Sequence, residues 1–462
     1  MKLPEQVAEI IGKLREHGFA AYAVGGCVRD TILGLKPNDW DICTSALPEE
    51  MKQVFDGYHT VDTGLKHGTL TVVIQHIPYE ITTFRVDGEY TDHRHPDSVH
   101  FVDRVDEDLA RRDFTVNAMA YSDEAGIVDL YGGQEDIEKK IIRCVGEPAK
   151  RFEEDALRIL RALRFASTYD FSVEEKTSAA IHTLYPTLNQ VAAERIREEL
   201  LKLLCGKACG RILREYTDVF CGIIPELKPA VGFDQNNPHH LYDVWEHTIR
   251  GVENIEAIPL LKLTMLLHDT GKPLTMTLDE KGISHYYGHP DKSAEIAGRV
   301  AERLRLDRNT ADNLVTLVRA HDIDLRNDRK IMLRRLRKFG KDNLERLFLI
   351  HRADRIATGT RDRDEKEADT RILQESLEML LQEHPCYSLK DLAVNGRDLI
   401  ALGLKGPEVG KTLERLLDKV IDGKVANERD ALLRCASSSF EGTGYRVKGE
   451  RGGAAQGDRI RG

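Results

Sequence analysis

Residues 21–45 read AYAVGGCVRDTILGLKPNDWDICTS, and this stretch decides the fold of the first part of the chain. Gly25 and Gly26 follow a short apolar run, so we expect a strand to turn into a helix there. Because glycine has no Cβ, the backbone at such a turn can come close to the phosphates of a ligand. Asp39 and Asp41 should share one face, since residues i and i+2 of an extended strand point the same way. The pattern predicts phosphoryl or nucleotidyl transfer with Mg²⁺, which neutralises a polyphosphate and activates the attacking oxygen.

Further motifs follow these two in order along the chain. GGCVRD (25–30) and DWDIC (39–43) resemble the head domain of the class II tRNA nucleotidyltransferases and bacterial poly(A) polymerases, members of the polymerase β superfamily. The resemblance continues through GLKHGTLTVVI (64–74), YEITTFR (79–85), DGEYTDHRHPDSV (87–99), RRDFTVNAMAY (111–121) and RFEEDALRILRALRF (151–165). It therefore covers residues 20–165 almost without interruption.

Three carboxylates are expected at the catalytic centre. Asp39 and Asp41 are the expected Mg²⁺ ligands. Glu80 is the candidate third carboxylate, because a lone acid on an apolar strand is costly unless it serves a charge. An exposed edge residue is the alternative interpretation of Glu80.

The resemblance also implies a nucleotide-binding set. Contacts to the incoming triphosphate are implied for Gly25, Gly26, Arg29 and Arg112, and support of the ribose is implied for Asp113 and Asn117. The forked guanidinium of arginine suits the geometry of phosphate.

Base selection is expected from Asp155 and Arg158, which would lie on one face of a helix over residues 155–165. A carboxylate accepts from an exocyclic amine, and a guanidinium donates to ring nitrogen and carbonyl acceptors. Cytosine and adenine carry that amine, whereas uracil and guanine present a carbonyl, so the pair could select C and A without a template. Spacing alone favours an ordinary surface ion pair, but the match to the family's EDxxR motif favours base recognition. For Arg161 and Arg164 the resemblance suggests phosphate contacts.

A second set of ligand types lies between residues 239 and 354: His247, His268, Asp269, His289, His321 and Asp354. Imidazole and carboxylate ligands on helices can bind one or two divalent transition metals. Their order H…HD…H…H…D, with Lys272 after the HD pair, resembles the HD phosphohydrolase superfamily. The resemblance implies metal-dependent hydrolysis of phosphate esters. A decayed HD fold without activity is the alternative.

The strand and helix patterns predict an α+β protein. They alternate up to about residue 145, which predicts a head with a small mixed sheet, and they are helical afterwards. The resemblance implies that this head is polymerase-β-like. The expected divisions are a nucleotidyltransferase head (1–145), a helical neck and body for nucleotide selection and RNA binding (146–235), an HD phosphohydrolase domain (236–360), a helical tRNA-binding tail (361–436) and a disordered Gly- and Arg-rich end (437–462).

Composition sets broad limits on location and partners. The net charge is −10, so an RNA-binding surface would have to be a local basic patch. The eight cysteines form no CxxC pair, and no apolar run is long enough for a membrane span or a signal segment. We therefore expect a reduced, cytoplasmic protein without a membrane partner.

The resemblance implies addition of CCA to tRNA 3′ ends from CTP and ATP. The segment between Arg85 and Arg111 resembles the full-length flexible loop of CCA-adding members, which is shortened in CC-adding ones. The HD domain would act on 2′,3′-cyclic or phosphorylated RNA ends. The alternatives are a poly(A) polymerase, a CC- or A-adding enzyme, or an HD hydrolase whose head only binds RNA.

Overall fold

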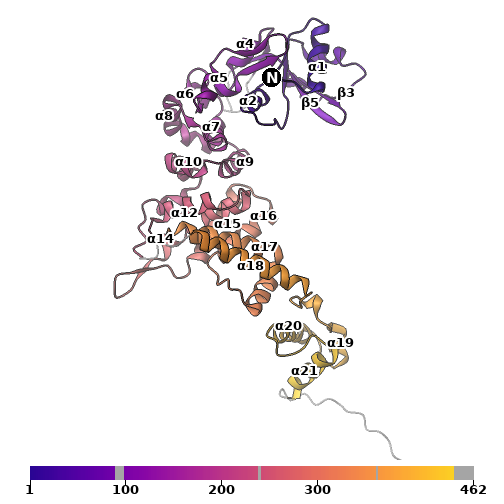
Figure 1. Ribbon diagram of the computed structural model, residues 1–462, viewed down its shortest axis with the longest axis vertical. Coiled ribbons are helices and arrows are strands. Elements are labelled where there is room, and N and C mark those ends of the chain that lie inside the picture. Colours follow the sequence, from indigo (N-terminus) through magenta and orange to yellow (C-terminus); the bar gives the residue numbers. More distant parts are fainter. Residues whose placement is uncertain (89–97, 238–240, 360–362, 442–462) are drawn as a thin grey trace, which may run out of the picture. The chain divides into compact units, whose positions relative to one another are not determined.

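The computed structural model describes residues 1–88, 98–237, 241–359 and 363–441 (Figure 1). Residues 89–97, which are part of the predicted flexible loop, lie outside these ranges. The chain forms two compact units. The first comprises Met1–His321 with Ala353–Arg361, and the second comprises Asp322–Arg352 with Asp362–Gly462.

The first unit begins with a seven-stranded mixed sheet in the order β3-β4-β5-β2-β1-β8-β9. Its strands are β1 (Ala21–Val24), β2 (Ile42–Thr44), β3 (His59–Val61), β4 (Thr69–Ile74), β5 (Ile77–Thr83), β8 (Met119–Ser122) and β9 (Gly126–Asp129). β2 and β5 are parallel, with Ile42 beside Ile81, and the other neighbours are antiparallel. The expectation of a mixed sheet in the head is confirmed.

Short helices surround this sheet: α1 (Glu5–Glu16), α2 (Gly26–Ile32), α3 (Pro48–Val54), α4 (Val105–Ala110) and α5 (Gly133–Glu138). Strands β6 (Arg85–Asp87) and β7 (Val99–Phe101) form a separate pair beside it. α1 buries Val7, Ile10, Ile11 and Leu14, the spacing of one helix face. After α1 the chain reverses at Gly18, whose φ of +88° is a conformation that glycine adopts without strain.

Between residues 148 and 320 the described part of the first unit consists mainly of helices. Its helices are α6 (Pro148–Glu154), α7 (Leu157–Tyr169), α8 (Glu175–Leu184), α9 (Ala193–Leu204), α10 (Cys209–Glu215), α11 (Thr217–Ile223), α12 (Val244–Asn254), α13 (Pro259–Leu267), α14 (Lys272–Thr275), α15 (His289–Arg303) and α16 (Arg308–Ala320). Two-residue strands add small pairings: β10 (Ile141–Ile142) with β11 (Ser172–Val173), and β12 (Thr277–Leu278) with β13 (Ser284–His285).

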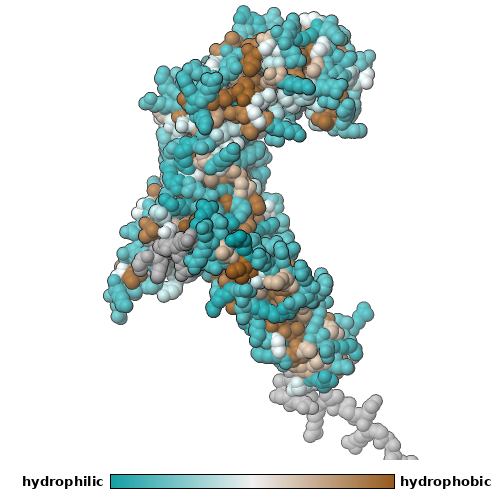
Figure 2. Space-filling view, viewed as in Figure 1, coloured by the Kyte–Doolittle hydropathy of each residue, from teal (hydrophilic) through white to brown (hydrophobic). Residues whose placement is uncertain are grey.

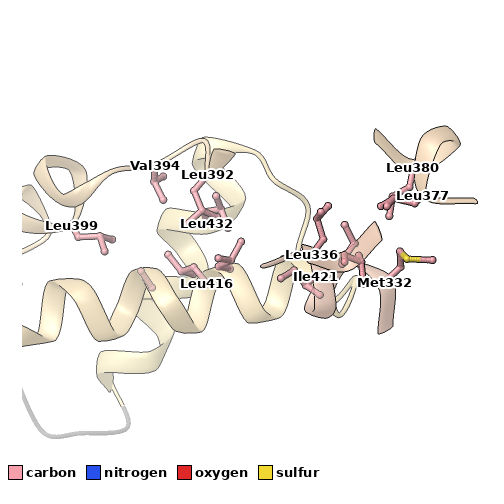
Figure 3. Close-up of a cluster of buried hydrophobic side chains, with 14 of the residues drawn as sticks. Met332, Leu336, Leu377, Leu380, Leu392, Val394, Leu399, Leu416, Ile421 and Leu432 are labelled. Atoms are coloured by element: carbon pink, nitrogen blue, oxygen red, sulfur yellow. The ribbon is translucent and has the colours of Figure 1, made fainter. Parts of the chain in front are cut away.

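The second unit is helical and has its own apolar core. It contains most of α17 (Arg329–Ala357), which is interrupted at Gly340, together with α18 (Arg363–Gln382), α19 (Gly396–Ala401), α20 (Pro407–Ile421) and α21 (Arg429–Glu441). Leu336, Leu377, Leu416 and Leu432 belong to the buried cluster drawn in Figure 3. α21 continues to Glu441, beyond the expected start of the disordered end at residue 437.

The surface seen in Figure 2 is largely hydrophilic, with apolar residues in separate patches. Among the residues that the structure describes, no helix combines the length and apolar character needed to cross a membrane.

Candidate active site and metal centre

The turn between β1 and α2 has the conformation that the glycine pair predicts. Gly25 has a φ of +81° and donates its N–H to the carbonyl of Met119 over 3.0 Å. A Cβ on Gly25 would lie only 2.9 Å from Nη1 of Arg112. The absence of a side chain at Gly25 therefore lets the Arg112 guanidinium approach the backbone of the turn, which creates a cationic environment suited to phosphate.

The three carboxylates of the expected catalytic centre lie at the start of β2 and on β5. Asp39 and Asp41 come directly before β2 rather than within it, although the Asp41 carbonyl accepts from Val24 N–H over 2.9 Å. Because Ile42 pairs with Ile81, the register places Asp41 beside Glu80. Glu80 is exposed, whereas its neighbours on β5, Tyr79 and Ile81, are buried. Glu80 therefore faces the open side of the sheet.

The charges of Asp39 and Glu80 act on the carboxylate of Asp41. Asp41 is partly buried, and this burial is the main cause that raises the pKa of its carboxylate to about 6. The charges of Asp39 and Glu80 add to the rise. Arg112 opposes the rise in pKa. Neighbouring carboxylates repel one another, and a bound divalent cation relieves this repulsion. Because Mg²⁺ prefers oxygen ligands, the residues present fit this cation.

Behind the turn, Arg29 is buried in a polar network. Its Nη1 donates to Oδ1 of Asn117 over 2.5 Å, and its guanidinium stacks on the rings of Phe165 and Tyr169 at 5.0 and 4.7 Å. Asn117 Nδ2 donates to Oδ1 of Asp113 over 3.1 Å. The sequence-predicted residues Arg29, Asn117 and Asp113 are therefore connected in one chain of hydrogen bonds.

Asp113 joins this network to α7. Arg161 donates from Nη2 and Nε to Oδ2 of Asp113 over 2.6 and 2.9 Å. Burial alone would raise the pKa of Asp113, but the charge of Arg161 and the hydrogen bonds from Asn117 and Arg161 outweigh it and lower the pKa to about 2. Asp113 is thus ionised at neutral pH, and Arg161 is engaged by a carboxylate.

The expectation that Asp155 and Arg158 share one continuous helix is wrong. α6 ends at Glu154, and Asp155 has extended backbone angles (φ −145°, ψ 102°) before α7 begins at Leu157. At this break, Oδ1 of Asp155 accepts the N–H of Leu157, the first residue of α7, over 3.1 Å.

Asp155 and Arg158 also do not form the ordinary ion pair that their spacing allows. Asp155 is bound by Arg195 of α9, with Nη2 2.9 Å from Oδ2. Arg158 donates to Oε2 of Glu154 over 2.6 Å and to the carbonyl of Arg151 over 3.2 Å. Each member of the predicted pair is therefore held by a different partner.

A second cluster lies among α12, α13, α15, α16 and α17. His247, His268, Asp269 and Asp354 bring ligand atoms within 4.8 Å of one another, and so do Asp269, His289 and His321. Nε2 of His247 lies 3.3 Å from Oδ2 of Asp269 and 2.9 Å from Oδ1 of Asp354. Nε2 of His289 lies 3.3 Å from Oδ1 of Asp269. The two oxygens of Asp269 thus face two different groups.

The backbone fixes the rings of this cluster. Nδ1 of His268, His289 and His321 contacts the carbonyl three residues earlier, at 2.7, 2.8 and 2.7 Å respectively. Such contacts leave Nε2 of each ring directed at the cluster, the arrangement that metal-binding histidines use.

Asp269 is the central group of the cluster. Lys272 Nζ lies 2.7 Å from its Oδ2, but among the described residues neither buried oxygen accepts a hydrogen bond of normal geometry. Burial would raise the pKa of Asp269, and the positive charges of His268 and Lys272 lower it well below its ordinary value. The imidazole nitrogens of the cluster converge on the Asp269 oxygens, which accept no hydrogen bond of normal geometry from the described residues. This arrangement fits one or two divalent transition metals.

Comparison with known proteins matches both parts of the chain. Residues 21–143 match the family described as "Poly A polymerase head domain", and residues 291–436 match a tRNA nucleotidyltransferase domain 2 family. Residues 170–231 match the family described as "Probable RNA and SrmB- binding site of polymerase A".

Two relatives are similar over nearly their whole length. The CCA-adding enzyme of Limosilactobacillus reuteri is 35% identical over 441 residues, which are 93% of this chain and 95% of the relative. The chain belongs to the CCA-adding enzyme family. The CCA-adding enzyme of Enterococcus faecalis is 33% identical over 97% of both chains.

Solved structures of the family share the fold. The Bacillus stearothermophilus CCA-adding enzyme in complex with CTP matches with a TM-score of 0.74 and 30% identity, over 96% of this chain and 99% of that one. The Thermotoga maritima CCA-adding enzyme complexed with tRNA matches with a TM-score of 0.55 and 22% identity, over 94% of this chain and 95% of that one.

The structure adds residues to the candidate site that motif reading missed. Asp108 is buried and binds both Arg111 and Arg112, over 2.8 and 3.1 Å. Arg195 binds Asp155, and Glu199 lies 2.6 Å from Nε of Arg164. Asp108 precedes RRDFTVNA by only three residues, so its spacing could have suggested it. Arg195 and Glu199 lie outside the motifs quoted in the sequence analysis, although residues 170–231 match a family model.

Proposed function

We propose that this protein extends the 3′ end of tRNA with C, C and A, using CTP and ATP without a nucleic-acid template. The observation that carries the proposal is the placement of Asp39, Asp41 and Glu80 beside the Gly25 turn and Arg112. Similarity to CCA-adding enzymes over nearly the whole chain supports the same activity. We assign nucleotide addition to residues 1–235, with residues 361–436 as a further tRNA-binding region.

In this mechanism the tRNA 3′-hydroxyl attacks the α-phosphate of the incoming nucleotide, and pyrophosphate leaves. Gly25, Gly26, Arg29 and Arg112 bind the triphosphate, while Asp113 and Asn117 support the ribose. Asp39 and Asp41, with Glu80 beside them, would hold Mg²⁺, which supplies charge neutralisation at the phosphates. Because Arg161 and Arg164 are engaged by Asp113 and Glu199, a phosphate contact from either would require it to share or exchange that partner.

Purified protein should add two C residues to a tRNA that ends at its discriminator base when CTP is the only nucleotide. With CTP and ATP together, the product should be three nucleotides longer and extension should then stop. Gel separation at one-nucleotide resolution measures both results. A long run of A would indicate a poly(A) polymerase, and a product that never gains A would indicate a CC-adding enzyme.

Base choice provides a second test. Asp155→Ala or Arg158→Ala should relax discrimination against UTP and GTP more than either variant changes triphosphate affinity. The loss should correspond to roughly 1–3 kcal/mol of selectivity, because one hydrogen-bonding partner of the base is removed. Single-nucleotide incorporation kinetics with each of the four nucleotides measure it. Unchanged nucleotide preference in both variants would exclude the pair from base recognition.

A second activity is favoured by the histidine cluster. We propose that residues 236–360 hydrolyse phosphate esters at RNA ends, such as 2′,3′-cyclic phosphates. His247, His268, Asp269, His289, His321 and Asp354 would hold the metal, with Asp269 directed at both halves of the site. A divalent metal there would supply Lewis-acid polarisation of the phosphate. Lys272, which is buried beside Asp269, would place a positive charge next to the substrate anion.

A further inference from the structure

The last residue of α7, Tyr169, contacts the helix that follows the glycine pair. Its hydroxyl donates to Oδ1 of Asp30 over 2.9 Å, and Asp30 belongs to α2, which begins at Gly26. α7 ends at Tyr169, and Asp170 after it has a left-handed backbone (φ 56°, ψ 49°), a common form of helix end. Tyr169 therefore connects the end of α7 to a segment 139 residues earlier in the chain.

The carboxylate of Asp30 also holds Arg29. Nε and Nη2 of Arg29 lie 2.9 and 2.8 Å from Oδ1 of Asp30. The side chains of Arg29 and Asp30 are only 7% and 16% exposed. Nη2 lies close to the turn as well, because a Cβ on Gly26 would be 3.5 Å from it. Asp30 thus fixes one edge of the Arg29 guanidinium beside the backbone of the glycine turn.

The ring of Tyr169 supports the face of the same guanidinium. Its centroid lies 4.7 Å from Cζ of Arg29, and it stacks on the ring of Phe165 at 6.2 Å with an interplanar angle of 15°. An aromatic face attracts a cation that lies over it. Burial raises the pKa of the Tyr169 hydroxyl to about 12, so at neutral pH the hydroxyl keeps the proton that it donates to Asp30. Tyr169 therefore acts on Arg29 in two ways, through the carboxylate of Asp30 and through its own ring.

We propose that Tyr169 is a positioning residue for triphosphate binding, which orients Arg29 through Asp30 and through its ring. This inference rests on the proposed contact of Arg29 with the triphosphate of CTP and ATP. A guanidinium binds phosphate oxygens best when its fork points at them, and Tyr169 reduces the orientations open to it. Because every nucleotide carries the triphosphate, Tyr169 should strengthen the binding of CTP and ATP equally and leave the choice of base unchanged.

The test compares variants of the full-length protein. Tyr169→Phe removes the hydroxyl and keeps the ring, Tyr169→Leu removes both, and Asp30→Asn removes the carboxylate charge. Tyr58→Phe is the matched control, because the Tyr58 hydroxyl donates to Oε1 of Glu9, a carboxylate of α1, over 2.6 Å. For each variant, kcat and KM are measured with CTP and ATP, and the melting temperature is recorded. The inhibition constant of inorganic triphosphate, which has neither base nor ribose, is measured as well.

Tyr169→Phe should raise the KM for CTP and for ATP by the same factor, roughly fivefold, with kcat little changed. Inhibition by inorganic triphosphate should weaken by that factor, and Tyr169→Leu should have a larger effect. Adding Tyr169→Phe to Asp30→Asn should weaken triphosphate inhibition little further, because the hydroxyl acts through that carboxylate. Tyr58→Phe should keep the wild-type values.

Unchanged KM values and triphosphate inhibition in Tyr169→Phe would overturn the inference. A rise in KM with only one of the two nucleotides would overturn it too, because the triphosphate is common to both. If Tyr169→Leu does not fold, Tyr169→Phe decides, since it keeps the buried ring.

Arg29→Gln separates this inference from the proposed function. If Arg29→Gln leaves inhibition by inorganic triphosphate unchanged, the proposed contact of Arg29 with the triphosphate fails, and the positioning role of Tyr169 fails with it. If Arg29→Gln weakens inhibition and Tyr169→Phe does not, only the positioning role fails.

Discussion

Replacement of Asp41 by alanine is expected to lower incorporation of both CTP and ATP by about three orders of magnitude or more, because electrostatic stabilisation supplies most of the catalysis in phosphoryl transfer. Asp39→Ala should have a similar effect. Binding of tRNA should persist in both variants, since the carboxylates occupy a small area at the start of β2. Single-turnover extension assays measure the chemistry, and gel-shift titration measures tRNA binding.

Asp56→Ala is the matched control for this prediction, because Asp56 is exposed in the turn after α3. It should extend tRNA at the wild-type rate. A loss of less than about tenfold in both Asp39→Ala and Asp41→Ala would remove these residues from the catalytic centre.

Replacement of His268 or Asp269 by alanine should abolish phosphoesterase activity while CCA addition survives. His268 and Asp269 are buried at the centre of the histidine cluster, and Asp269 faces both groups of ligands. Nucleotide addition should continue because Mg²⁺ in the head would be held by oxygen ligands from a different part of the chain. Hydrolysis of 2′,3′-cyclic nucleotides and elemental analysis of bound metal measure the loss.

Asp279→Asn serves as the control here, since Asp279 is exposed beside the strand pair β12–β13. It should keep metal and hydrolysis. A wild-type protein that retains no metal after incubation with Ni²⁺, Mn²⁺ or Co²⁺ would contradict the metal site. A His268→Ala protein that hydrolyses cyclic phosphates as well as wild type would place hydrolysis elsewhere.

The parts of the site that could be predicted from the sequence depend on local geometry. The turn at Gly25 follows from an apolar run and a glycine that adopts a positive φ, and both are visible within a few residues. The residues of the histidine cluster could be named from the sequence because its histidines and aspartates lie in or beside segments with a helical pattern. That the two oxygens of Asp269 face two groups required the packing of several helices.

The conformation at Asp155 could not be predicted in the same way. The helical pattern in the sequence continues through residues 155–165, whereas in the structure Asp155 lies at a break and contacts the Leu157 N–H and Arg195. Arg195 is 40 residues away in the chain. The ion pair between Arg161 and Asp113, which are 48 residues apart, likewise could not be inferred from local spacing. Long-range charge pairing therefore determined the details that motif reading missed.

The ion pairs of Asp113 with Arg161 and of Asp155 with Arg195 have a consequence for how the protein unfolds. Each pair joins segments that are distant in the chain, and each includes a residue of the proposed nucleotide site. Opening α7 or α9 alone would break these contacts and leave a partly buried charge on the segment that stays folded without its partner, which makes partial opening unfavourable. Nucleotide-binding capacity and protection of α7 and α9 amides from hydrogen exchange should accordingly disappear together as denaturant is added, as one cooperative unit.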